Sequence, residues 1–66
     1  MDVGLSLIFQ GVDPNMTDHE VYTNDLRMGD LASELGFQSI WGVEHHFTDY
    51  TMCPDVTQYL SYWAGR

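Results

Sequence analysis

The chain has 66 residues, of which ten are acidic and only Arg27 and Arg66 are basic, so its formal net charge is −8. That sign argues against a nucleic-acid or an anionic membrane partner. The sequence has no apolar run close to the ~20 residues of a membrane-spanning helix and no signal-peptide pattern at its N-terminus, and its single cysteine, Cys53, excludes an internal disulfide. We therefore expect a cytoplasmic protein.

Residues 3–9 (Val-Gly-Leu-Ser-Leu-Ile-Phe) form the first apolar run. Both faces of this run carry apolar or small residues, which is typical of a strand buried on two sides in a parallel sheet. Successive strand residues point to opposite faces. Ser6 and Ile8 are therefore predicted to share one face, while Leu7 and Phe9 share the other.

A helix is predicted to follow the loop of residues 10–16. Thr17 and Glu20 have the spacing of a capping box, in which each side chain satisfies a backbone amide of the other residue. Apolar residues then recur at helical spacing and predict the buried face: Val21, Met28, Leu31, Ala32 and Leu35. We expect Gly29 to let this helix approach the sheet closely and Gly36 to end the helix in left-handed conformation.

The second half of the chain repeats the order of strand and helix. Residues 37–43 are predicted to form a strand and residues 44–53 a loop, and Pro54 suits the first position of a second helix. The apolar stripe of that helix is Val56, Leu60, Trp63 and Ala64. A strand–helix–strand–helix order is typical of parallel strands joined by a right-handed crossover.

Two parallel strands do not close a sheet, because each of them keeps an unpaired edge. We therefore expect residues 1–66 to be an N-terminal fragment of a larger α/β domain. The predicted fold class is a (β/α)8 TIM-type barrel, of which this chain supplies the first two βα units. Such a fragment is expected to be inactive by itself.

Glu44, His45 and His46 follow the second predicted strand, at the carboxyl end where α/β folds place their sites. A histidine there can act as a general acid or base near neutral pH. Glu44 can either hold an imidazole in one tautomer or contact a ligand directly. Regular alternation would keep the two histidines from pointing into the same site. The alternative interpretation is a histidine pair on the surface with no function.

Metal binding is a weaker interpretation of the same residues. Glu44 and His46 would share a strand face, but no third ligand follows at a spacing that zinc sites use, so no metal site is predicted. Cys53 is interpreted as a small packing residue rather than as a nucleophile. The sequence contains no glycine-rich phosphate loop of either common type.

Several short motifs resemble the bacterial luciferase-like monooxygenase superfamily. The most specific is the run Trp41-Gly42-Val43-Glu44-His45-His46-Phe47; the others are Val3-Gly4-Leu5, Leu35-Gly36-Phe37, Pro54-Asp55 and Ala64-Gly65-Arg66. These motifs occur in order and extend over nearly the whole chain.

The resemblance implies a flavin-dependent monooxygenase on a (β/α)8 barrel, usually a homo-oligomer. It would take reduced FMN from a separate flavin reductase and use O2 on a small organic substrate. The resemblance implies His45 as a catalytic base and places Glu44 and His46 close to the flavin. Ser6 and Ile8 would line the barrel interior beside the flavin ring. The basic residues that hold the flavin phosphate lie later in family members, outside this chain.

Two further functions stay open. Related enzymes of the same fold use a deazaflavin for hydride transfer without oxygen, and these 66 residues do not separate the two chemistries. A small non-enzymatic interaction module, complete in itself, is an alternative from another class. That alternative predicts a cooperative thermal transition for the chain alone.

Overall fold

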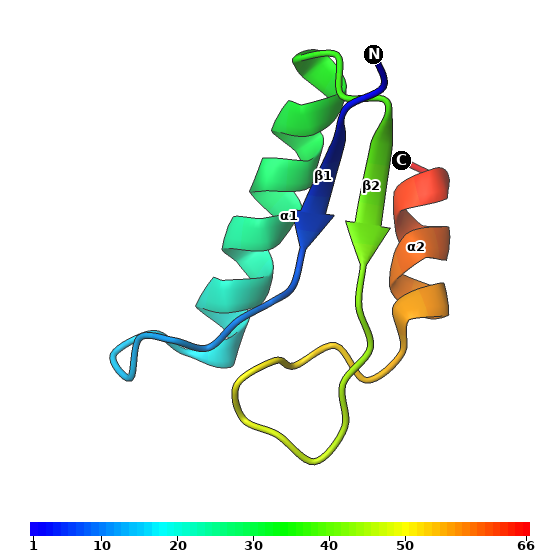
Figure 1. The fold of residues 1–66 in the computed structure, drawn as a ribbon. Helices are drawn as coiled ribbons and strands as arrows, with labels where there is room; N and C mark the ends of the chain where they lie inside the picture. The colour runs from blue at the N-terminus through cyan, green and yellow to red at the C-terminus, as the bar shows by residue number, and fades with distance from the viewer.

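The computed structural model describes all 66 residues as a small α/β unit. The elements follow in the order β1 (Gly4–Leu7), α1 (Asp18–Glu34), β2 (Ser39–Gly42) and α2 (Val56–Ala64) (Figure 1). The two strands are parallel and pair from Gly4 with Ser39 to Leu7 with Gly42. The predicted order and the parallel pairing are thus confirmed, and they fit the start of a larger β/α fold. Both strands are shorter than predicted, because only the residues within this ladder have a partner strand.

The start and the end of α1 agree with the sequence signals. The Thr17 hydroxyl accepts a hydrogen bond from the Glu20 amide at 3.2 Å, and the Glu20 carboxylate accepts one from the Thr17 amide at 2.7 Å. Gly36 follows the helix with φ of +86°, a conformation that favours glycine. The capping box and the left-handed glycine are therefore confirmed.

The apolar stripe predicted for α1 is only partly buried. Val21 and Ala32 are buried as expected, but Met28, Leu31 and Leu35 are 49%, 51% and 73% exposed. The prediction was wrong for these three residues, because the sheet has only two strands and covers a narrower part of the helix surface than the stripe occupies.

Gly29 does not serve the role expected of it. It is buried, and a Cβ atom at this position would lie 2.4 Å from the Cη2 and Cζ2 atoms of Trp63 in α2. The glycine therefore permits a close contact between the two helices and not, as predicted, between α1 and the sheet.

The start of α2 also corrects a prediction. Pro54 is not the first helical residue, since the helix begins at Val56 with Asp55 as its N-cap. The Asp55 carboxylate accepts hydrogen bonds from the Gln58 amide at 3.0 Å and from the Thr57 hydroxyl at 2.7 Å. Aspartate is a strong N-cap residue, so the boundary lies two residues further on than the proline suggested.

Both helices cover the same face of the sheet. Gly42 contacts Tyr59 of α2, and the buried Phe9 ring contacts Tyr22 of α1 at 4.6 Å and Tyr59 at 4.9 Å between ring centroids. Phe9 forms a small core with Val21 and Cys53, so the interpretation of Cys53 as a packing residue is confirmed.

The opposite face of the sheet is open. Trp41 is 65% exposed on this face and lies over Gly4, and its indole N–H donates to the Ser39 hydroxyl at 3.0 Å. Ser6, which pairs with Trp41 across the ladder, is exposed on the same face. No helix of the chain has the combination of length and apolarity needed to span a bilayer.

Candidate functional site

The segments that follow β1 and β2 meet at the carboxyl end of the sheet. Gln10 forms an isolated antiparallel bridge with Thr51. The Gly11 amide donates to the Tyr50 carbonyl at 2.8 Å, and the Met52 amide donates to the Phe9 carbonyl at 3.2 Å. The long loop between β2 and α2 therefore turns back beside the end of β1 (Figure 1).

The Glu44 carboxylate has one partner within this loop and another in α2. One carboxylate oxygen, Oε2, lies 2.9 Å from Nε2 of His46, and the other, Oε1, accepts from the Val56 amide at 3.0 Å. The hydrogen bond with His46, followed by that from Val56, holds the pKa of Glu44 below its ordinary value. Val56 is the first residue of α2, so the carboxylate also lies at the positive end of the helix dipole.

The two histidines differ in their surroundings. His46 is paired with Glu44, and its side chain is 53% exposed. The His45 side chain is exposed and makes no hydrogen bond within the chain, although its amide donates to the Cys53 carbonyl at 3.0 Å. The structure thus brings together Glu44 and His46 and leaves His45, the predicted catalytic base, with a free imidazole.

Ser6 and Ile8 lie on the β1 side of the site. Ser6 is exposed on the open face, as the alternation predicted, and Ile8 is half-buried just beyond the end of the strand. Trp41 shares the face of Ser6 and was not among the predicted site residues. Strand alternation places Trp41 on one face of its own strand, but its place beside Ser6 depends on the register between the two strands, which only the structure gives.

Two phenylalanines in the segments that follow the strands have left-handed backbone conformations. Phe9 has φ of 53° and Phe47 has φ of 57°. Such angles are uncommon for residues other than glycine and concentrate at functional sites. The Phe9 amide donates to the Asp25 carboxylate of α1 at 2.7 Å, which holds the turn, while the Phe47 side chain is fully exposed. No sequence signal marks a non-glycine residue for this conformation.

Cys53 lies near the end of this loop, and its side chain is buried. Burial raises the pKa of its thiol, and the nearby Glu44 and Asp55 charges act in the same direction. The thiol therefore stays protonated and packs in the core. No three histidine, cysteine, aspartate or glutamate side chains lie close enough together to hold a metal ion.

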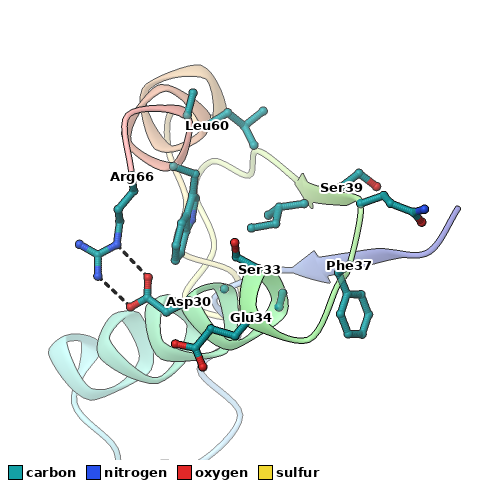
Figure 2. A pocket seen from close by; sticks show the side chains of 13 residues that line it. Asp30, Ser33, Glu34, Phe37, Ser39, Leu60 and Arg66 are labelled. Carbon is teal, nitrogen blue, oxygen red and sulfur yellow. Dashed lines mark hydrogen bonds and ion pairs between the residues drawn. The ribbon is translucent and has the colours of Figure 1, made fainter.

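A groove of about 620 Å³ lies between α1 and α2 at the other end of the sheet, beside the start of β2 (Figure 2). The Arg66 side chain reaches from the end of α2 to α1 and donates to both carboxylate oxygens of Asp30, at 2.9 and 2.7 Å. These hydrogen bonds lower the pKa of Asp30 and raise the pKa of Arg66. Its lining includes Leu60 and Phe37 but neither histidine nor cysteine. The groove therefore combines apolar side chains with the Asp30–Arg66 ion pair and the carboxylate of Glu34.

The residues at the carboxyl end of the sheet include no lysine or arginine that could hold a phosphate. On the open face, Trp41 covers Gly4 at the start of β1, and Ser6 is exposed nearer to the carboxyl end. The cations of the chain are elsewhere, because Arg27 is exposed halfway along α1 and Arg66 is held by Asp30 in the groove. A phosphate-bearing cofactor would need basic residues from outside this chain.

No model of a known protein family matches the chain. The alkanal monooxygenase alpha chains of Photorhabdus laumondii subsp. laumondii and of Photorhabdus luminescens are each 29% identical to it over 52 residues. That stretch is 79% of this chain but 14% of each relative, so the chain spans a small part of the proteins it matches. The similarity is distant and agrees with the resemblance to luciferase-like monooxygenases.

Proposed function

We propose that the chain is the opening part of a flavin-dependent oxidoreductase that uses reduced FMN and O2 on a small organic substrate. The observation that carries this proposal is the Glu44–His46 pair at the carboxyl end of two parallel strands, with an open sheet face beside it. The distant similarity to two alkanal monooxygenase alpha chains supports the monooxygenase class.

The uncovered surfaces support a larger barrel. Parallel sheets are normally covered on both faces, yet Trp41 is 65% exposed on the open face of this one. Only seven of the 66 residues are buried. Further parallel strands would pair with the free edges of β1 and β2 and curve so that the open face becomes the inside of a barrel. The exposed α1 residues Met28, Leu31 and Leu35 would then pack against another helix.

In this proposal the flavin ring lies at the carboxyl end of the sheet, in contact with Ser6, Ile8, Glu44 and His46. A bound reduced flavin would supply the electrons for oxygen activation. His45 would transfer a proton as the catalytic base, because its imidazole is free of partners within the chain. The flavin phosphate would be held by later basic residues, and a separate reductase would supply the reduced cofactor to a homo-oligomer.

A chimera tests the proposal. The 52 matching residues of this chain would replace their counterparts in the alkanal monooxygenase alpha chain of Photorhabdus luminescens. We expect the chimera to fold, to bind reduced FMN under anaerobic conditions and to oxidise an alkanal. Replacing His45 with alanine in the chimera should leave flavin binding intact and lower turnover by about 10²-fold or more, the usual contribution of a general acid or base.

His19→Ala is the matched control, since His19 is an exposed histidine in the first turn of α1 and is not one of the proposed site residues. It should leave binding and turnover unchanged. A folded chimera that binds a deazaflavin but not FMN would move the proposal to hydride transfer. A chimera that does not fold would refute the placement of this chain in a barrel. A chimera that folds but binds neither cofactor would refute the flavin site.

A further inference from the structure

We propose that Glu44 is a positioning residue, whose carboxylate fixes the His46 ring in the tautomer protonated at Nε2 and ties that ring to the first turn of α2. Three groups define this arrangement: the Glu44 carboxylate, the His46 imidazole and the Val56 amide. A role of Glu44 in turnover rests on the proposed function. The tautomer of His46 and the link to α2 are independent of that function.

The two oxygens of Glu44 serve different partners. Oε2 lies 2.9 Å from Nε2 of His46, and Oε1 lies 3.0 Å from the Val56 nitrogen. An ionised carboxylate can only accept hydrogen bonds, so Nε2 of His46 must be the donor. A neutral His46 therefore carries its proton on Nε2 and keeps Nδ1 as its basic nitrogen. A proton acceptor with a defined free nitrogen is thus placed at the carboxyl end of β2.

The N-terminus of α2 divides its free amides between two carboxylates. Asp55 takes the Gln58 amide as the N-cap, while Glu44 takes the Val56 amide. The first amides of a helix have no partner within the helix, and both anions are stabilised there by the helix dipole. The Asp55 charge opposes ionisation of Glu44, but the hydrogen bonds from His46 and Val56 outweigh it.

Glu44 therefore connects the imidazole to the packing of the whole helix. Further along α2, Tyr59 contacts the Phe9 ring and Trp63 covers Gly29 of α1. A movement of α2 would carry the Val56 amide, the Glu44 carboxylate and the His46 ring with it. The His45 side chain has no such hydrogen bond. The imidazole of His45 can therefore change its orientation, whereas Glu44 fixes that of His46.

The test is long-range ¹H–¹⁵N NMR of the ¹⁵N-labelled 66-residue chain at alkaline pH, where histidine side chains are neutral. We expect the His46 ring to show a single tautomer with the proton on Nε2, and His45 and His19 to show averaged tautomers. In Glu44→Ala, the His46 signals should become averaged like those of His45. Hydrogen exchange of the Val56 amide should then become about tenfold faster or more, as for the loss of a hydrogen bond to a charged group.

Two further variants separate positioning from general structural damage. Glu44→Asp keeps the charge but is one methylene shorter, so it should lose one of the two contacts and restore only one of the two readouts. His19→Ala should change neither. The proposal is overturned if His46 in the unmodified chain shows the same averaged tautomers as His45, or if Glu44→Ala leaves its signals and the Val56 exchange unchanged. None of these measurements involves flavin, so this proposal and the proposed function can fail separately.

Discussion

A single methyl group added at Gly29 should weaken the docking of α2 on α1 while it favours the helical state of α1. These two effects usually change in the same direction. Gly29→Ala adds a Cβ that would lie 2.4 Å from two ring atoms of Trp63 and 3.0 Å from a third. Carbon atoms at their best separation are ~3.5 Å or more apart. The variant therefore cannot keep both helices where they are.

The change in the free energy of docking depends on whether each effect acts on the docked state, the undocked state or both. Overpacking of this kind costs about 1–3 kcal/mol, and it acts only when α2 is docked on α1. Alanine also favours helix over glycine by about 1 kcal/mol, but this gain stabilises α1 in the docked and the undocked state alike, so it does not offset the clash in the docking equilibrium. A net cost of about 2 kcal/mol would lower the docking equilibrium constant roughly 30-fold.

The assay uses Trp63 as the reporter in a Trp41→Phe background, since Trp41 is exposed on the other face of the sheet. In Gly29→Ala we expect the Trp63 emission to shift to longer wavelength and its urea midpoint to fall, while the far-UV circular dichroism of α1 increases. Asn24→Ala is the control, because it raises helix propensity at an exposed site of α1 without touching Trp63.

Opposite changes in emission and helicity are the diagnostic result. If Gly29→Ala keeps the emission of the parent and raises its urea midpoint as Asn24→Ala does, the close contact between the helices does not exist in solution.

Three other predictions concern the whole chain. With seven of 66 residues buried, a circular dichroism melt of the chain should be broad and unchanged by FMN; a sharp, reversible transition would favour the self-contained interaction module. Thr51 is 3% exposed and its hydroxyl has no hydrogen-bond partner, so Thr51→Val should leave the urea midpoint unchanged or raise stability by up to about 1 kcal/mol; a clear loss would reveal an unseen partner. The pKa values of Asp30 and Glu44 are lowered by Arg66 and by His46 respectively. A carboxyl whose pKa is lowered by folding stabilises the fold above its ordinary pKa, about 4, and loses this effect as the pH falls. The Trp63 emission should therefore shift to longer wavelength on acidification from pH 6 to about pH 2, and Asp30→Asn should reduce that pH dependence; an acid-insensitive emission would contradict the role of these pairs.

Part of the site was readable from the sequence. The position of Glu44, His45 and His46 after a strand followed from the apolar run that precedes them, and the structure places all three at the carboxyl end of β2. Their relations to one another were not readable. The partner of Glu44 on the helix side, Val56, is twelve residues away along the chain, and no local pattern predicts which loop carboxylate reaches a helix end.

The sequence by itself determined the features that depend on a few neighbouring residues. The capping box of Thr17 and Glu20 involves a hydrogen bond pair across three positions, and Gly36 ends α1 through its own backbone freedom. The order of strands and helices likewise follows from short periodic patterns. Such signals are complete within one turn or one strand.

The tertiary structure decided everything that depends on where distant segments meet. It placed the Trp63 ring against Gly29 and left Met28, Leu31 and Leu35 exposed. It also gave His46 a hydrogen bond with Glu44, which His45 does not have. A periodic pattern states that a helix has an apolar face, but the width of the surface that covers that face is set by the other elements. With two strands present, that surface is narrow.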